Sequence, residues 1–266
     1  MHKILKDGHI HSPYCPHGTK DSFEKYIEKA LEEGLEEISF TEHLPLPKKI
    51  MEEELFRDSA PVEEEFEKYI KELRNLKKRY EGKIKINIGA EVDYIEGLED
   101  ETRKILDKYG VNFEDSILSV HFFYIDGSFY CIDYSKEKFK ELIELLGGIE
   151  KVYDKYYVTL LKSIKADLGV YKPKRIGHPT LVRIFNKEFP CEYDNNELME
   201  DIVKEISYRG YEIDHNTAGL RKVYCKEEYP SEKLKELIER YNIKQVYGSD
   251  SHEAKDIAYN FEKFRC

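Results

Sequence analysis

The chain lacks the features of a secreted or membrane-bound protein. It contains no Cys-x-x-Cys pair, and its cysteines are an odd, scattered set: Cys15, Cys131, Cys191, Cys225 and Cys266. Such a set fits a reduced compartment better than a disulfide framework. The sequence has no apolar run near the roughly 20 residues of a membrane-spanning helix, and no signal-peptide hydrophobic region. We therefore expect a cytoplasmic protein with no membrane partner.

The sequence also lacks a surplus of positive charge. Its 54 Asp and Glu residues outnumber its 43 Lys and Arg residues, for a formal net charge of -11. Because binding to a nucleic-acid backbone needs a basic surface, we expect no nucleic-acid partner. Internal repeats, disordered linkers and low-complexity tails are absent as well. The length of 266 residues is close to that of one α/β barrel and predicts a single domain over residues 1–266.

Strand-like and helix-like segments alternate along the chain. Strands are expected over residues 4–12, 37–43, 84–94, 116–124, 175–178, 211–215 and 245–249. Helices are expected over residues 21–34, 62–80, 102–109, 136–146, 149–168, 195–208, 231–241 and 253–264. Such alternation implies parallel strands joined by right-handed crossovers, so the expected fold class is α/β with seven strand–helix units.

Histidine and carboxylate side chains gather at the ends of the expected strands. The motifs are Asp7-Gly8-His9-Ile10-His11, Pro16-His17-Gly18, Thr41-Glu42-His43, Gly89-Ala90-Glu91-Val92-Asp93, Ser119-Val120-His121, Gly177-His178-Pro179 and Ser249-Asp250-Ser251-His252. Imidazole and carboxylate are the usual nitrogen and oxygen ligands of Zn, Mn and Fe. Because the strands of such a barrel end at one face, this concentration predicts a multinuclear metal site there.

Each motif also has an ordinary interpretation when it is taken alone. His9 and His11 are two apart on a strand, so they face one side and could either chelate a metal or face solvent. Asp250 could ligate a metal or cap the following helix. His121 and His178, taken singly, are typical of buried histidines with protein partners. Only the shared position of these residues at strand ends favours a metal site, because unrelated polar residues would not gather there by chance.

Two carboxylates and two further histidines complete the expected site. Glu91 follows an apolar strand, where burying a carboxylate is costly unless a cation pairs with it, as a bridge between two metals would allow. Glu42 and His43 are neighbours, so a regular strand would point only one of them inward. His17 lies in a Pro-His-Gly loop and could cover the site from outside.

Arg183 and Arg221 each follow a strand that contributes to the expected site. Guanidinium groups clamp phosphate bidentately, although each arginine alone is more simply a surface residue in an ion pair. Asp7, Asp93 and His215 are expected to support the ligands or the surrounding structure.

In their order, the motifs resemble those of the PHP family, named for polymerase and histidinol phosphatase. The shared features are a His-x-His near the N-terminus, a Thr-Glu-His motif, a strand-end Glu, later single histidines and a closing Asp-x-His, spanning His9 to His252. The HisJ/HisK-type histidinol-phosphate phosphatases of this family are similar over three longer stretches, residues 11–18, 40–45 and 248–252. The resemblance therefore covers nearly the whole chain.

The resemblance implies a distorted (β/α)7 TIM-like barrel of the PHP fold, with three divalent metal ions. The implied ligands of the first ion are His9, His11, Glu91 and Asp250. Those of the second ion are Glu91, His121 and His178. Those of the third ion are His17, His252 and either Glu42 or His43. The ligand set suits Zn, Mn and Fe alike.

The function implied by the resemblance is hydrolysis of L-histidinol phosphate to L-histidinol and phosphate, in histidine biosynthesis. A hydroxide bridging two metals would attack phosphorus. Arg183 and Arg221 match arginines that contact phosphate in this subfamily, and His43 would protonate the leaving alkoxide.

Two other functions remain open at this point. One is a PHP phosphoesterase of other specificity, such as a nucleotide or oligonucleotide phosphatase or an exonuclease. The other is a non-catalytic metal-binding or regulatory barrel. An amidohydrolase would need a carboxylated lysine at a mid-barrel strand end, and no lysine occupies such a position.

Overall fold

The structure is a computed structural model that describes residues 4–51 and 56–264, so Cys266 lies outside the described residues. Within these residues, seven parallel strands form one sheet in the order β1-β2-β3-β4-β7-β8-β9. They are β1 (Lys6–Ile10), β2 (Glu37–His43), β3 (Lys85–Asp93), β4 (Ile117–Ser119), β7 (Arg175–Ile176), β8 (Glu212–Asn216) and β9 (Gln245–Gly248). The expected seven-stranded α/β sheet is confirmed.

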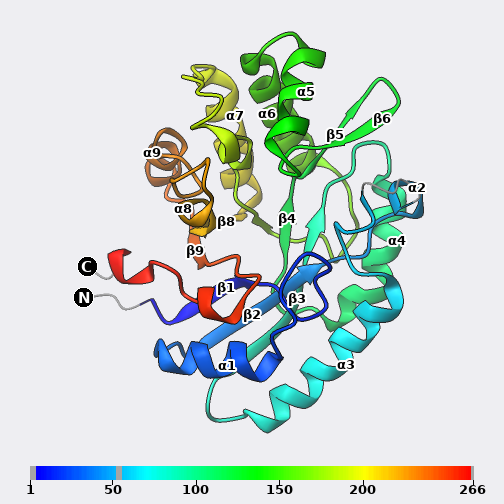
Figure 1. The fold of residues 1–266 in the computed structure, drawn as a ribbon, viewed down its shortest axis with the longest axis vertical. Helices are drawn as coiled ribbons and strands as arrows, with labels where there is room; N and C mark the ends of the chain where they lie inside the picture. Colours follow the sequence, from blue (N-terminus) through cyan, green and yellow to red (C-terminus); the bar gives the residue numbers. More distant parts are fainter. Residues whose placement is uncertain (1–3, 52–55, 265–266) are drawn as a thin grey trace.

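The sheet curls until its last strand meets its first (Figure 1). Beyond the end of β9, Ile10 and Ser251 form a parallel bridge, and Asp250 N donates to the carbonyl oxygen of His9 over 2.8 Å. These contacts close the sheet into the expected (β/α)7 barrel. They also bring the last predicted motif, Asp250-x-His252, against the first, His9-x-His11.

Helices surround the barrel on its outside (Figure 1). The α-helices are α1 (Phe23–Glu32), α2 (Lys48–Met51), α3 (Glu63–Arg79), α4 (Glu99–Tyr109), α5 (Lys136–Leu146), α6 (Ile149–Lys165), α7 (Asn196–Arg209), α8 (Ala218–Arg221) and α9 (Glu232–Arg240). The short 3-10 helices are η2 (Gly110–Asn112), η3 (Leu181–Phe185), η4 (Ala254–Asp256) and η5 (Phe261–Phe264). Among the described residues, none of the helices is both long and apolar enough to cross a membrane.

Amphipathic spacing explains how these helices pack. In α1, Phe23, Tyr26, Ile27 and Ala30 recur at helical spacing and are fully buried, and Phe40 of β2 belongs to the same core. Burying an aromatic or aliphatic side chain contributes about 1.5 to 3 kcal/mol, so such faces hold each helix against the sheet. The apolar core therefore lies between barrel and helices and leaves the barrel interior to polar residues.

A buried arginine occupies the barrel interior near the amino ends of the strands. Arg175 is 2% exposed, donates from Nη2 to the carbonyl oxygen of Gly8 over 2.7 Å, and pairs with Asp115 at 3.1 Å. A buried charge of this kind needs such a partner. This pair forms a polar layer that ties β1, β7 and the loop before β4 together.

Two segments differ from the expectation. The strand expected over residues 116–124 divides into β4 and a separate hairpin, β5 (Phe122–Ile125) and β6 (Ser128–Cys131), joined by the predicted Asp126-Gly127 turn. β4 ends at Ser119, where its pairing with β3 also ends at Asp93, and β7 pairs with it only at Leu118. The helix expected over residues 253–264 is replaced by η4 and η5, because Ala258 and Asn260 have positive φ values of 54° and 65°, which an α-helix does not allow.

Candidate metal centre

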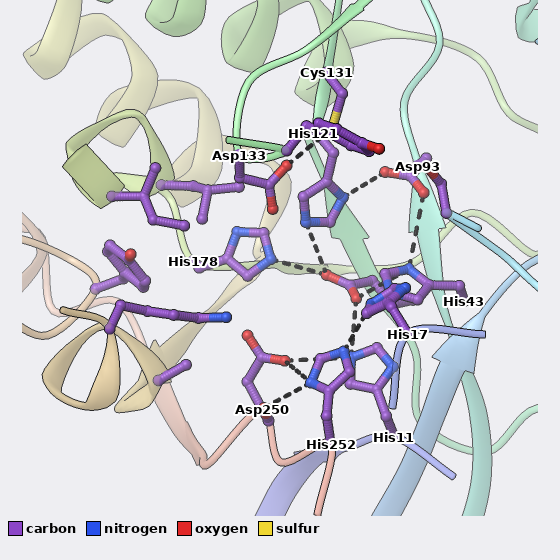
Figure 2. A pocket seen from close by; sticks show the side chains of 18 of the residues that line it. His11, His17, His43, Asp93, His121, Cys131, Asp133, His178, Asp250 and His252 are labelled. Carbon is purple, nitrogen blue, oxygen red and sulfur yellow. Dashed lines mark hydrogen bonds and ion pairs between the residues drawn. The ribbon is translucent and has the colours of Figure 1, made fainter. Parts of the chain in front are cut away.

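A cavity of about 550 Å³ opens at the carboxyl ends of the strands. Eight of the ten predicted metal ligands line it, namely His11, His17, His43, Glu91, His121, His178, Asp250 and His252 (Figure 2). The other two, His9 and Glu42, are fully buried behind the lining. The structure thus brings together residues that are up to about 240 positions apart in sequence, as the strand-end pattern predicts.

Glu91 of β3 lies at the centre of the cluster. Imidazole nitrogens lie 2.9 to 3.8 Å from its two carboxylate oxygens, and they belong to His9, His11, His43, His121 and His178. Ser119 at the end of β4 donates to Glu91 Oε1 over 2.6 Å. A carboxylate surrounded on both oxygens by nitrogen ligands has the position that a bridge between two cations requires.

Ligand atoms from these residues form compact groups. Each group has all its ligand atoms within 4.8 Å of one another, and the groups are His9–His11–Asp250, Glu91–His121–His178, His43–Asp93–His121 and His11–Cys15–His43–His252. His9 Nε2, His11 Nε2 and His43 Nδ1 are buried without a hydrogen-bond partner. Since such orphaned nitrogens are costly, a bound cation would satisfy them, and the donor set fits several divalent ions.

The electrostatics of the cluster also suit cations. Burial disfavours the ionised form of Glu91, yet the neighbouring imidazoles, His9 first among them, hold its pKa well below the usual range. Burial likewise lowers the pKa of His9, but Asp214 and Asp250 outweigh it and raise that pKa to about 10. The carboxylates therefore create a negative field, which favours the protonated form of His9. Divalent cations would neutralise the same field when bound.

Two further carboxylates hold ligand imidazoles from behind. Asp214 Oδ2 of β8 lies 2.8 Å from His9 Nδ1, and Asp93 Oδ1 of β3 lies 2.6 Å from His121 Nδ1. Each contact fixes which ring nitrogen faces the cavity. Gly248 allows this approach, because a Cβ there would lie 2.5 Å from both Asp214 Oδ1 and the Cβ of His9.

Sequence reasoning identified Asp93 but missed Asp214. The alternation of β8 could have found it, because Asp214 and Asn216 face the barrel interior together. His215, which drew attention as a histidine, points the other way. It contacts Glu228 and lies 3.0 Å from Gln245 Oε1, and it does not line the cavity.

The neighbours Glu42 and His43 have different surroundings. Glu42 Oε2 accepts hydrogen bonds from Ser12 N at 2.9 Å and Ser12 Oγ at 2.5 Å, and its Oε1 accepts one from His43 N at 3.0 Å. Glu42 belongs to none of the compact ligand groups, whereas His43 belongs to two. Burial and the neighbouring His11 lower the pKa of His43 well below its usual value, so its imidazole is neutral.

The two predicted phosphate-binding arginines also differ in position. Arg221 lines the cavity and donates to the carbonyl oxygens of Ser249 and Asp250 at 2.9 and 3.0 Å. Arg183 is not among the lining residues, because its guanidinium is paired with Glu227. The cavity contains instead a cation that sequence reasoning missed, the exposed Lys222 that follows α8.

Comparison with known proteins agrees with this geometry. The sequence profile of the PHP domain matches residues 7–218, which is more than half of the chain. The chain belongs to the PHP family. A histidinol-phosphatase from Bacillus subtilis (strain 168) is 46% identical over 267 residues, an alignment that covers 98% of this chain and 99% of that protein.

Two solved structures share the fold. The hisK protein from Listeria monocytogenes, provisionally assigned as a histidinol phosphatase, superposes with a TM-score of 0.92 at 38% identity, covering 98% of this chain and 100% of that one. Histidinol phosphate phosphatase from Lactococcus lactis, complexed with zinc, L-histidinol and phosphate, superposes with a TM-score of 0.74 at 22% identity, covering 99% and 92%. The second likeness supports the fold alone.

Proposed function

We propose that this chain hydrolyses L-histidinol phosphate to L-histidinol and phosphate, a phosphomonoesterase reaction of histidine biosynthesis. The observation that carries this proposal is the complete cluster of imidazole and carboxylate ligands around Glu91, in a chain 46% identical to a histidinol-phosphatase. A degenerate, non-catalytic barrel would not need to keep every ligand. A nucleic-acid substrate is disfavoured by the net charge of -11.

We propose three divalent ions, Zn, Mn or Fe, as cofactors. The first would be held by His9, His11, Glu91 and Asp250. The second would be held by Glu91, His121 and His178. The third would be held by His17, His43 and His252. When bound, such ions supply Lewis-acid charge for phosphate oxygens and a nucleophile at neutral pH.

His43 rather than Glu42 is our choice for the third ion. The carboxylate of Glu42 already accepts three hydrogen bonds from Ser12 and His43, whereas His43 Nδ1 is buried and unpaired. The same choice argues against His43 as general acid, because an imidazole that ligates through Nδ1 keeps only its Nε2 proton, and the N–H of a neutral imidazole is a much weaker acid than an imidazolium.

Arg221 and Lys222 are the proposed phosphate contacts of this chain. Arg221 uses three N–H groups on Ser249, Asp250 and Asp256, which leaves two for a phosphate oxygen. Lys222 adds a mobile point charge beside it. Arg183 does not line the cavity, so it can take this role only if its side chain moves away from Glu227 and into the cavity.

The test of this proposal is substrate comparison on metal-loaded protein. Phosphate release from L-histidinol phosphate should exceed release from p-nitrophenyl phosphate and from nucleotides, and the metal-free protein should be inactive until Zn, Mn or Fe is restored. Comparable rates on all substrates would contradict the specificity, and full activity without metal would contradict the mechanism. Elemental analysis should find three ions per chain.

Two further properties are proposed. Residues 1–266 form one barrel domain, which the closure of β9 onto β1 supports. The protein is cytoplasmic, which the free thiols of Cys15, Cys131, Cys191 and Cys225 fit.

A further inference from the structure

The cavity contains fixed charge beyond the proposed metal ligands. Arg221 and Lys222, at the end of α8, place positive charge on one wall. Asp133, in the connection between β6 and α5, places a carboxylate in the same cavity. Figure 2 shows this carboxylate turned toward the space beside His121 and His178. The cavity therefore has positive charge on one part of its wall and a carboxylate on another, both next to the metal cluster.

Asp133 forms no ion pair with a lysine or arginine in the described structure, although its charge helps to raise the pKa of the neighbouring His121. Its hydrogen bond within the described structure comes from the thiol of Cys131, over 3.1 Å to Oδ1. Glu253, by contrast, pairs with Lys255 at 2.6 Å, and Asp256 pairs with Arg221 at 3.2 Å. Asp58 also lines the cavity without such a pair, but it lies on the side of His17, whose Nδ1 is 2.8 Å from the carbonyl oxygen of Asp58. Asp133 Oδ2 is thus left to interact with whatever enters the cavity.

Asp133 is also outside the metal cluster. None of the compact ligand groups in the described residues includes it, although it lies next to His121 and His178 in Figure 2. Its position is therefore that of a group facing a ligand bound on the metals, not that of a metal ligand.

We propose that Asp133 binds the ammonium group of the substrate and selects phosphate esters that contain an adjacent amine. This inference rests on the proposed histidinol-phosphate phosphatase function. In L-histidinol phosphate, the amine is on the carbon next to the ester-bearing carbon, so it must lie close to the phosphate. A phosphate held by the metals, Arg221 and Lys222 would place that ammonium beside the cluster, near His121, where Asp133 is a carboxylate with no lysine or arginine partner.

The remaining part of such a substrate also fits the cavity. Leu181, Ile184 and Tyr229 line it and offer an apolar surface to an imidazole ring. The charged contacts would then fix the orientation of the substrate, and the apolar wall would contact the imidazole ring in either of its protonation states.

The test uses full-length, metal-loaded Asp133→Asn, which keeps the shape of the side chain and an acceptor for Cys131. Its substrates are L-histidinol phosphate and the deamino analogue 3-(imidazol-4-yl)propyl phosphate. For histidinol phosphate, KM should rise about 10- to 100-fold with kcat within a few-fold, as expected for loss of a hydrogen bond to a charged group. For the deamino analogue, both constants should stay near wild type. Calorimetry should show the same loss for L-histidinol as a product.

Glu253→Gln is the matched control, because it removes the same charge from the same wall at a residue already paired with Lys255. It should leave the ratio of kcat/KM for the two substrates unchanged. An unchanged KM in Asp133→Asn would overturn the proposal. Equal loss on both substrates, or loss of bound metal by elemental analysis, would overturn it in favour of a structural role or an imidazole contact. Failure of the wild type to prefer histidinol phosphate over p-nitrophenyl phosphate would instead refute the proposed function itself.

Discussion

Replacing Asp214 by Asn should weaken metal binding without changing the ligands themselves. Asp214 is fully buried, and its Oδ2 lies 2.8 Å from His9 Nδ1 and accepts from Asn216 Nδ2 at 3.0 Å. Burial disfavours its charge, yet His9 lowers its pKa, so the pair is charged. The Asn variant keeps the shape and loses that charge, and His9 can then turn or present the wrong nitrogen.

The magnitude follows from the type of hydrogen bond that is lost. A bond to a charged group contributes about 1.5 to 3 kcal/mol and a neutral one about 0.5 to 1.5 kcal/mol, a difference of about 1 to 2 kcal/mol. This corresponds to roughly 5- to 30-fold weaker binding, close to the effect of about 10- to 100-fold known for residues behind metal ligands. Activity at saturating metal should stay within a few-fold of wild type.

The assay is titration of metal-free protein with Zn in competition with a chromophoric chelator. Glu228→Gln is the matched control, because Glu228 makes the same carboxylate–imidazole contact with His215 of the same strand but outside the cavity. It should bind Zn like the wild type. A folded Asp214→Asn variant, checked by circular dichroism, that binds Zn as tightly as the wild type would refute the reasoning.

Three further predictions concern the same site. Glu91→Gln should lower the rate of phosphate release by roughly 100- to 1000-fold, because the variant removes the central charge that several imidazoles surround, and elemental analysis should find fewer ions per chain. In the metal-free protein, the pKa of His9 is raised from 6.5 to about 10, so protonated His9 stabilises the fold fully below pH 6.5, and this contribution is lost as the pH rises through about 10. Urea unfolding at a series of pH values should show this loss. Zn affinity should rise over the same pH interval, because Zn binding displaces the proton from His9. Lys222→Ala should raise KM about 10-fold, because a charged phosphate contact is lost, and this increase should be larger than the increase in KM caused by Arg183→Ala. A larger increase for Arg183→Ala in steady-state kinetics would show that Arg183 leaves Glu227 to bind phosphate.

The sequence predicts the barrel well because its strands and helices have different periods. Alternating apolar residues such as Ile84, Ile86 and Ile88 indicate a strand, and helical spacing in the segment that becomes α1 indicates a helix. The break after β4 could not be predicted in this way. It coincides with the ends of the pairings with β3 and β7, which are properties of the neighbouring strands and not of residues 116–124 themselves.

The predicted site has the same limit. Histidines at strand ends are recognisable because the ends of parallel strands must meet, whatever the loops do. Asp133 and Lys222 are on connections whose path depends on tertiary packing, so nothing in their local sequence marks them. The choice between Glu42 and His43 likewise depends on Ser12, thirty residues away, whose two hydrogen bonds occupy the carboxylate.

Backbone register, rather than side-chain flexibility, sets the geometry of the cluster. In the parallel pairing of β2 with β3, His43 is the partner of Glu91, so both side chains reach the cavity from adjacent strands. A slip of one residue would turn Glu91 to the other face of the sheet. Gly89 lets the chain before β4 pack closely on β3, because a Cβ there would lie 1.6 Å from the carbonyl oxygen of Asp115 and only glycine permits that approach. A larger residue at position 89 would therefore displace β3 and the central carboxylate together, which ties the metal centre to the formation of the barrel itself.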